Sequence, residues 1–167
     1  MAKQLLLMRH AKSSHDNPGL SDFDRPLNPR GTSDVPKMAA WLSQNNLTPD
    51  IIISSSAMRA ETTAKSLADH LDSSEITTEV TEDLYLAPGS IYLEYLARLS
   101  EQYSRPMFVG HNPGMENLVQ QLGGSNEVMP TCAVAVFEVS SGNWKEIAED
   151  ASKFQLGKVL RPKQLFS

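Results

Sequence analysis

Short apolar segments alternate with stretches of helical spacing along most of this chain, and this alternation constrains its fold more than any other feature. The apolar segments lie at Gln4 to Met8, Asp50 to Ile53, Ile76 to Val80 and Met107 to Val109, and they have the composition of strands. Strands that alternate with helices require right-handed crossovers, which place helices on both faces of a mostly parallel sheet. The sequence therefore predicts an α/β fold, a three-layer α/β/α sandwich.

Four helices are expected between these strands. They span about Pro29 to Asn45, Ala57 to Leu71, Pro88 or Ser90 to Gln102, and Met115 to Leu122. Asn28 before Pro29 is typical of a helix start, but Pro36 removes an interior backbone bond, so the first helix is expected to kink there or to begin later. Ser56 is the expected N-cap of the second helix.

The C-terminal part of the chain predicts an antiparallel addition to the sheet. Residues Thr131 to Val139 form an alternating apolar strand, and Ser140 to Asn143 form a turn. The short segment Trp144 to Ile147 is expected to be the second strand of this hairpin. The residues after Asp150 are polar and weakly periodic, so a wrapping tail is expected there.

Size and charge narrow the class of protein. A chain of 167 residues with 40% hydrophobic side chains fits one domain that spans residues 1–167. The net charge of -5 gives no general attraction to nucleic acid or anionic lipid, so an anion must be held by a local basic site. A single cysteine, Cys132, excludes an internal disulfide and suits a cytoplasmic location. The apolar runs are too short to span a membrane.

Chemically active side chains follow three of the predicted strands. Arg9 and His10 end the first strand, Arg59 follows the second, and His111 follows the strand that ends at Val109. The carboxyl ends of parallel strands share one edge of a sheet, where ligands bind in such folds. Guanidinium groups grip phosphoryl oxygens, and a neutral imidazole can attack phosphorus. A histidine after a strand is usually an ordinary loop residue, so the prediction of a phosphoryl-transfer site depends on all four together.

Four segments carry a family resemblance. They are Leu7 to Ser13, Arg25 to Gly31, Ser54 to Thr62 and Val109 to Gly114. In order and spacing they resemble the histidine phosphatase superfamily, which includes cofactor-dependent phosphoglycerate mutases and acid phosphatases, and above all its phosphohistidine phosphatase (SixA) branch.

The resemblance implies a phosphoglycerate mutase-like fold and a role for each of the four residues. His10 would be the nucleophile that forms a phosphohistidine intermediate. Arg9 and Arg59 would bind the phosphoryl group, and His111 would complete the pocket. Neither a metal nor another cofactor is implied.

One departure from the family pattern concerns the leaving group. Many members have a carboxylate that protonates the leaving alkoxide, at a position where this chain has Leu86; Glu82 and Asp83 are nearby alternatives. Without an acid, an alkoxide leaves poorly because an alcohol is almost as weak an acid as water, with a pKa of about 15.7. Imidazolium has a pKa of about 6.5, so a phosphohistidine departs more readily.

The short segment between Leu86 and His111 leaves no room for a lid, and an open site suits a phosphorylated side chain on a protein. The leading hypothesis is therefore a metal-independent phosphatase that acts on protein phosphohistidine in signal transduction. One alternative is a phosphomonoesterase for a small phosphate ester, with Glu82 or Asp83 as the acid. Another is an inactive phosphate-binding module.

Other reactive side chains are expected to be solvent-facing or structural. The solvent-facing set comprises His15, His70, Asp22, Asp24, Arg25 and Arg30. For the two arginines, surface salt bridges are expected, with a place at the rim of the pocket as the alternative. Cys132 is expected to be a buried small hydrophobic residue within a strand.

Overall fold

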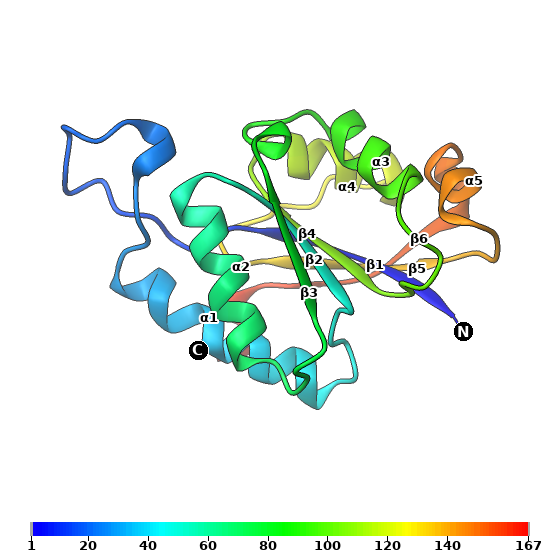
Figure 1. The fold of residues 1–167 in the computed structure, drawn as a ribbon, viewed down its shortest axis with the longest axis horizontal. Coiled ribbons are helices and arrows are strands. Elements are labelled where there is room, and N and C mark those ends of the chain that lie inside the picture. Colours follow the sequence, from blue (N-terminus) through cyan, green and yellow to red (C-terminus); the bar gives the residue numbers. More distant parts are fainter. Residues whose placement is uncertain (1, 167) are drawn as a thin grey trace.

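A computed structural model describes residues 2–166, which form one six-stranded sheet with the strand order β3-β2-β4-β1-β5-β6 (Figure 1). The strands are β1 (Lys3–Arg9), β2 (Ile51–Ser55), β3 (Thr77–Thr81), β4 (Pro106–Gly110), β5 (Val134–Val139) and β6 (Phe154–Leu160). β1, β2, β3 and β4 pair in parallel, whereas β5 and β6 add antiparallel pairs beside β1. The predicted α/β fold with an antiparallel portion near the C-terminus is confirmed.

Helices cover both faces of this sheet (Figure 1). They are α1 (Pro29–Gln44), α2 (Met58–His70), α3 (Gly89–Ala97), α4 (Gly114–Gly123), α5 (Trp144–Ala148) and α6 (Pro162–Phe166), with 3₁₀ turns η1 (Asp22–Asp24), η2 (Glu82–Leu84) and η3 (Ala151–Lys153). One apolar core joins the sheet to α3, α4 and α5, and a second joins it to α1, α2 and α6. None of these helices combines the length and the apolar character that a membrane crossing requires.

The central strand β1 shows why the sheet has two cores. Leu5 and Leu7 belong to one core, and Leu6 and Met8 belong to the other. Successive side chains of a strand point to opposite faces, so a strand covered on both faces reads as a continuous apolar run. All four side chains are buried, and the strand therefore delivers Arg9 and the following residues from a fixed position.

The helix α1 begins where its capping residue predicts. The side-chain oxygen of Asn28 accepts a hydrogen bond from the Gly31 amide at 2.8 Å, and Pro29 occupies the first turn. Pro36 lies inside the helix, so the later start that this proline suggested is wrong.

The predicted N-cap of α2 is also wrong. Ala57 occupies that position, and no side chain among the described residues caps the helix. The Ser56 hydroxyl is buried and makes no hydrogen bond within the described part of the chain.

The hairpin predicted at the C-terminal end has a different second strand. Trp144–Ala148 is the helix α5, in which the Asn143 side chain accepts from the Glu146 amide at 2.8 Å and caps the first turn. The Trp144 indole is buried and donates to the Tyr103 carbonyl at 2.8 Å. The partner of β5 is β6, so the predictions of a strand at 144–147 and of a wrapping tail after Asp150 are both wrong.

The segment before β5 closes against the end of β1. Cys132 is buried as expected, but it precedes the strand and has a positive φ of 68°. Its amide donates to the carbonyls of Arg9 at 3.1 Å and His10 at 3.0 Å. The strand predicted from Thr131 therefore begins only at Val134, because the preceding residues hold the turn that carries the site.

Candidate active site

His10 follows the last residue of β1 and has a defined ring orientation. Its amide donates to the Gly110 carbonyl at 3.0 Å, which ties it to the end of β4. Its Nδ1 lies 2.7 Å from the Ala11 carbonyl oxygen. A carbonyl only accepts, so Nδ1 carries the hydrogen and Nε2 has the lone pair. The side chain is buried, with 5% of the residue exposed.

The first turn of α2 places the Arg59 side chain against this lone pair. Its Nε donates to His10 Nε2 at 3.3 Å, and its Nη2 lies 3.4 Å from His111 Nδ1. Only 3% of the residue is exposed, so its position is set by packing and hydrogen bonds. Arg59 thus links the two imidazoles.

His111 enters the site from the end of β4. Its Nε2 lies 2.8 Å from Ser55 Oγ at the end of β2, and the centroids of the two imidazole rings are 5.1 Å apart. The end of β4 passes so close to Tyr92 that position 110 requires glycine, because a Cβ there would lie 1.8 Å from the Tyr92 hydroxyl oxygen. The adjacent strands β1, β4 and β2 therefore hold the pair of histidines.

Arg9 completes the set of four predicted residues. Its Nη1 donates to the Met129 carbonyl at 3.1 Å, an oxygen that also accepts from Asn112 Nδ2 at 3.0 Å. Within residues 2–166, Arg9 Nε and Asn112 Oδ1 are buried without a hydrogen-bond partner. The structure therefore brings Arg9, His10, Arg59 and His111 to one edge of the sheet.

These side chains surround a cavity of about 170 Å³, referred to below as the catalytic cavity. It is lined by Arg9, His10, Lys12, Ser13, His15, Arg25, Arg59, Leu86, His111, Asn112 and Thr131. Its lining includes four permanently charged cations and, among the described residues, no carboxylate. Such a cavity suits a small anion.

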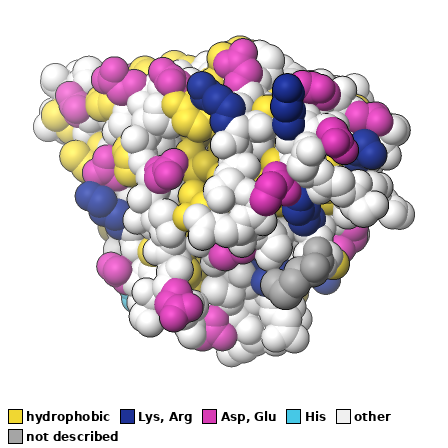
Figure 2. All heavy atoms as spheres, turned by 45° about the vertical axis from the view of Figure 1, so that its right-hand side comes forward, with side chains coloured by type: hydrophobic (Ala, Val, Ile, Leu, Met, Phe, Trp, Pro, Cys, Tyr) yellow, Lys and Arg dark blue, Asp and Glu magenta, His cyan; other side chains and the backbone are white. Residues whose placement is uncertain are grey.

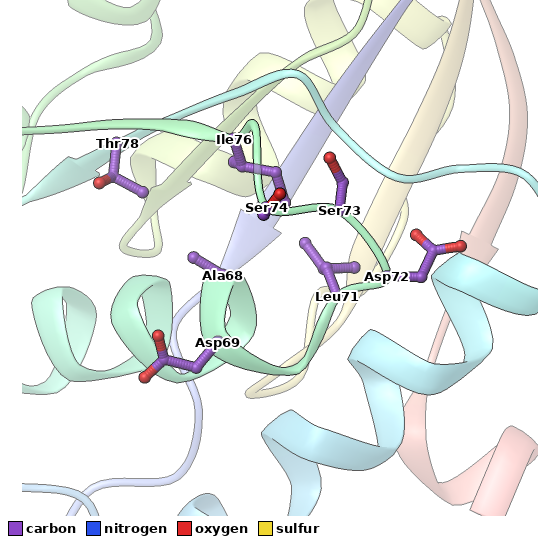
Figure 3. Close-up of a pocket in the computed structure, with 8 residues that line it drawn as sticks. All are labelled: Ala68, Asp69, Leu71, Asp72, Ser73, Ser74, Ile76 and Thr78. Carbon is purple, nitrogen blue, oxygen red and sulfur yellow. The ribbon is translucent and has the colours of Figure 1, made fainter.

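A wider cavity of about 670 Å³ lies elsewhere, between the end of α2 and the start of β3 (Figure 3). Its lining includes Asp69, Asp72, Ser73 and Ser74 but no histidine, lysine or arginine. It therefore lacks the groups that phosphoryl transfer requires. In the described part of the chain, no three His, Cys, Asp or Glu side chains are grouped closely enough to hold a metal ion.

Both imidazoles of the site are neutral near pH 7. Burial, with smaller effects from His111 and the neighbouring arginines, lowers the pKa of His10 to about 3. Burial and the positive charge of Arg59 lower the pKa of His111 to about 4. A neutral His10 keeps its Nε2 lone pair, which a nucleophile needs.

Asp22 is the functional neighbour that sequence reasoning missed. Arg59 Nη2 donates to its Oδ2 at 3.0 Å, Arg59 Nη1 donates to its main-chain oxygen at 2.7 Å, and the Tyr85 hydroxyl donates to Oδ2. The hydrogen bond from Tyr85, with those from Arg25 and Arg59, lowers the pKa of Asp22 well below its usual range. Asp22 is exposed, as expected, but it is also paired, since the 3₁₀ turn η1 folds it over Arg59.

The proposed acids Glu82 and Asp83 lie outside the catalytic cavity. Asp83 Oδ2 accepts from the Tyr95 hydroxyl at 2.6 Å. Leu86, with a φ of 51°, does line the cavity. Of these three residues, it is therefore Leu86, to which the resemblance assigns the place of the carboxylate, that lines the cavity.

The remaining side chains divide between the site and the surface. Arg25 lines the cavity, donates to Ser13 Oγ at 2.7 Å and pairs with Asp22 at 3.1 Å, so it belongs to the rim. His15 also lines the cavity, although a solvated loop role was expected. Arg30 lies outside it and pairs with Asp34 at 3.6 Å, and His70 is exposed, as expected for both.

Comparison with known proteins identifies the family to which this arrangement belongs. The family model described as histidine phosphatase superfamily (branch 1) matches residues 5–85. The phosphohistidine phosphatase SixA of Escherichia coli (strain K12) is 30% identical over 146 residues, which cover 84% of this chain and 88% of that protein. The chain belongs to the histidine phosphatase superfamily. It is a phosphatase.

Two further proteins are similar to this chain. An uncharacterized chloroplastic protein of Arabidopsis thaliana is 33% identical over 154 residues, which cover 87% of this chain and 71% of that protein. The solved structure of the protein histidine phosphatase SixA complexed with tungstate has a TM-score of 0.81 and 25% identity, and the match covers 97% of this chain and 99% of that one. The three-layer architecture is thus shared with a SixA phosphatase along nearly its whole length.

Proposed function

We propose that this phosphatase removes phosphate from a histidine side chain of another protein and that His10 carries the phosphoryl group in between. The observation that supports this most is the His10 Nε2 lone pair, which faces Arg59 beside a cationic cavity whose described lining has no carboxylate. The site thus offers a nucleophile and cations for the phosphoryl oxygens, but no proton donor of the carboxylic type.

The first step transfers the phosphoryl group between two imidazoles. His10 Nε2 attacks phosphorus, a bond from nitrogen to phosphorus forms, and the bond from phosphorus to the substrate nitrogen breaks with its electron pair going to that nitrogen. The other nitrogen of the substrate imidazole carries a proton, so this ring leaves neutral, and the positive charge passes to the ring of phospho-His10, which keeps its hydrogen on Nδ1. Arg9 and Arg59 stabilise the charge on the phosphoryl oxygens, and His111 completes the pocket.

The second step restores the enzyme. A water molecule attacks phosphorus of phospho-His10, the bond to Nε2 breaks, and inorganic phosphate leaves after the water loses a proton to solvent. The hydrogen bond from His10 Nδ1 to the Ala11 carbonyl holds the ring in one orientation through both steps. Neither step requires a metal or another cofactor.

We favour phosphohistidine over an alkyl phosphate as the substrate because the described lining of the catalytic cavity has no carboxylic acid that could protonate a leaving alkoxide. An alkoxide leaving group requires a proton, and Asp22, the carboxylate that contacts Arg59, is held ionised by Tyr85, Arg25 and Arg59, which lower its pKa. A substrate imidazole whose other nitrogen already carries a proton leaves neutral and needs no acid from the enzyme. The relatives agree with this choice, since the SixA of Escherichia coli is a phosphohistidine phosphatase and another SixA binds tungstate, a tetrahedral oxyanion similar in shape to phosphate.

The proposed function is tested by kinetics and by labelling. Steady-state turnover on a phosphohistidine protein should exceed turnover on sugar phosphates by a large factor. Brief incubation with a radioactive phosphohistidine donor should place acid-labile label on the wild-type protein and none on His10→Ala. The matched control is His70→Ala, which removes an exposed histidine and should keep both label and turnover.

Three outcomes would contradict the proposal. A preference for an alkyl phosphate would favour the phosphomonoesterase alternative. Full turnover by His10→Ala would exclude His10 as the nucleophile. Binding of phosphate by the wild type with no turnover on any donor would indicate an inactive module.

A further inference from the structure

A second cavity of about 430 Å³ adjoins the catalytic cavity, and five basic side chains line it. They are Arg9, Lys12, Arg30, Arg161 and Lys163, and we call the space they line the basic cavity. Arg9, Lys12 and Thr131 line both cavities, so the two are contiguous. Within the described chain, no acidic side chain lines the basic cavity.

Two arginines of the basic cavity are held in position by residues that do not line it. Arg161 donates to the Val128 carbonyl at 3.0 Å and to Glu127 Oε1 at 3.0 Å. Arg30 pairs with Asp34 at 3.6 Å. Neither carboxylate lines the cavity, so each positions an arginine without occupying the space in front of it.

Lys12 is the cation that connects the two cavities. Its side chain is exposed and forms no hydrogen bond or ion pair within residues 2–166. An ammonium group on a flexible stem can follow a bound anion into either cavity. The phosphoryl group and a second anion can thus be bound side by side.

This concentration of positive charge does not follow from the composition of the protein. The chain has 15 Lys and Arg against 20 Asp and Glu. On the face drawn in Figure 2, side chains of both signs are interspersed. A cavity lined by one sign of charge in a net acidic protein indicates a local site for an anion.

We propose that the basic cavity binds the carboxylate of an Asp or Glu side chain that neighbours the phosphohistidine on the substrate protein. This rests on the proposed function, because a group that enters the basic cavity together with a phosphohistidine then belongs to the same protein surface. Arginine forks bind carboxylates bidentately, and two of the arginines are already held in position. The cavity thereby selects phosphohistidines in an acidic setting.

The effect should be on binding more than on chemistry. The carboxylate contacts are present before and during phosphoryl transfer, so they lower KM and leave kcat almost unchanged. An acidic neighbour should lower KM about tenfold, the scale of one hydrogen bond to a charged group.

Peptides that carry one phosphohistidine provide the test. One peptide has Asp and Glu as neighbours, one has Asn and Gln, and one has Lys. Wild type should prefer the acidic peptide, and Lys163→Gln and Arg30→Gln should each lose most of that preference while turning over the amide peptide as before. Lys145→Gln is the matched control, because Lys145 is an exposed lysine on α5, away from the basic cavity.

A change of charge sign gives a second readout. Lys163→Glu should disfavour the acidic peptide and accept the Lys peptide better than wild type does. Arg30 lies against the buried Asp34, so a loss of fold in Arg30→Gln would show as a lower melting temperature, and the Lys163 variants then decide the matter.

The results separate this inference from the proposed function. If no peptide is hydrolysed, the proposed function fails. If all peptides are hydrolysed with equal KM, the function stands and the basic cavity has no part in selection. Phenyl phosphate and carboxyphenyl phosphate form a matched pair of small substrates, and a carboxylate preference confined to them would overturn the assignment to a protein side chain.

Discussion

At the scale of single residues, the carboxylate of Asp22 forms an ion pair with Arg59, the arginine that is proposed to bind phosphate. Its carboxylate accepts from Arg59 and from Tyr85, while about half of its side chain is exposed. A phosphoryl group that enters the site brings negative charge toward the same guanidinium. Asp22 and the phosphoryl group therefore compete for Arg59, although the main-chain oxygen of Asp22 also holds the arginine in place.

The substitution Asp22→Asn should strengthen phosphate binding. An amide oxygen can still accept from Arg59 Nη2, and the main-chain contact is retained, so the geometry survives while the competing charge is removed. The inhibition constant for inorganic phosphate should fall about fivefold, the upper range of one exposed ion pair. Steady-state inhibition at low ionic strength measures it.

Asp24→Asn is the control for this change. Asp24 lies in the same 3₁₀ turn and accepts from Ser21 Oγ, and it does not line the catalytic cavity. This variant should bind phosphate as wild type does. Weaker phosphate binding in Asp22→Asn would mean that the carboxylate mainly positions Arg59.

At the scale of elements, the site depends on how closely helices approach the strand ends. The first turn of α1 packs on the segment after β1, where a Cβ at Gly31 would lie 2.1 Å from the Lys12 carbonyl oxygen. No side chain fits at that distance, and the obstacle is backbone, which cannot rotate away. Gly31 therefore fixes the separation between α1 and the chain that carries His10.

We expect Gly31→Ala to push these two segments apart. Overpacking of this kind costs about 1–3 kcal/mol of folding free energy. The melting temperature should fall, and turnover should fall more than stability alone explains, because the segment after His10 shifts. Thermal denaturation and steady-state kinetics below the transition measure the two effects.

Gly19→Ala is the matched substitution in an exposed loop, where the nearest side-chain atom is 3.3 Å from the added Cβ and belongs to Asn17. It should leave both quantities nearly unchanged. A Gly31→Ala protein with wild-type stability and turnover would show that α1 is not held at this point.

The sequence predicted the strands that are covered on both faces, and also the edge strand β3, which is rich in β-branched residues. β1, β2 and β4 are continuous apolar runs because helices pack on either side of them. β6 was missed because only Phe154 and Leu160, at its two ends, are buried, and its register with β5 shifts near Val136 and Phe137. Its apolar alternation is broken accordingly.

The helix α5 was mistaken for a strand although its signal is present in the sequence. Trp144 and Ile147 are three residues apart, which places them on one face of a helix, and Asn143 with Glu146 forms a capping pair. Four residues are too few for periodicity to decide between the two structures. The local cap was the better guide.

The candidate site was predictable to the extent that its residues follow strands. Arg9 ends β1, His10 and His111 come directly after β1 and β4, and Arg59 lies in the first turn of the helix after β2. Asp22 lies in a loop turn whose position over Arg59 depends on contacts between residues far apart in sequence. No local pattern marks such a carboxylate as part of a site.

At the scale of the whole molecule, folding buries the two histidines of the site in their neutral form. Residue exposures are 5% for His10 and 2% for His111, and burial lowers their pKa values to about 3 and about 4. In the unfolded chain both side chains have the ordinary pKa of about 6.5. The unfolded state therefore takes up protons at a pH where the folded state does not.

This difference makes stability depend on pH in a defined direction. Above about pH 6.5 neither state protonates these histidines, so they add no pH dependence. As the pH falls from about 6.5 to about 4, each histidine should lower the free energy of unfolding by about 1.4 kcal/mol per pH unit, because the unfolded state binds the extra proton. The lowered pKa of Asp22 adds a loss of stability only at a more acidic pH, below its ordinary value of 3.8.

Urea denaturation at a series of pH values between 7 and 4 tests this on wild type, on His10→Ala and on the double variant His10→Ala with His111→Ala. Each removed histidine should reduce the slope of the free energy of unfolding against pH by about 1.4 kcal/mol per pH unit, whatever the substitution does to stability at pH 7. The double variant should be almost independent of pH in this window. Three parallel curves would mean that the histidines keep their ordinary pKa of about 6.5 in the folded protein, and His10 would then be protonated, without the lone pair of a nucleophile, below that pH.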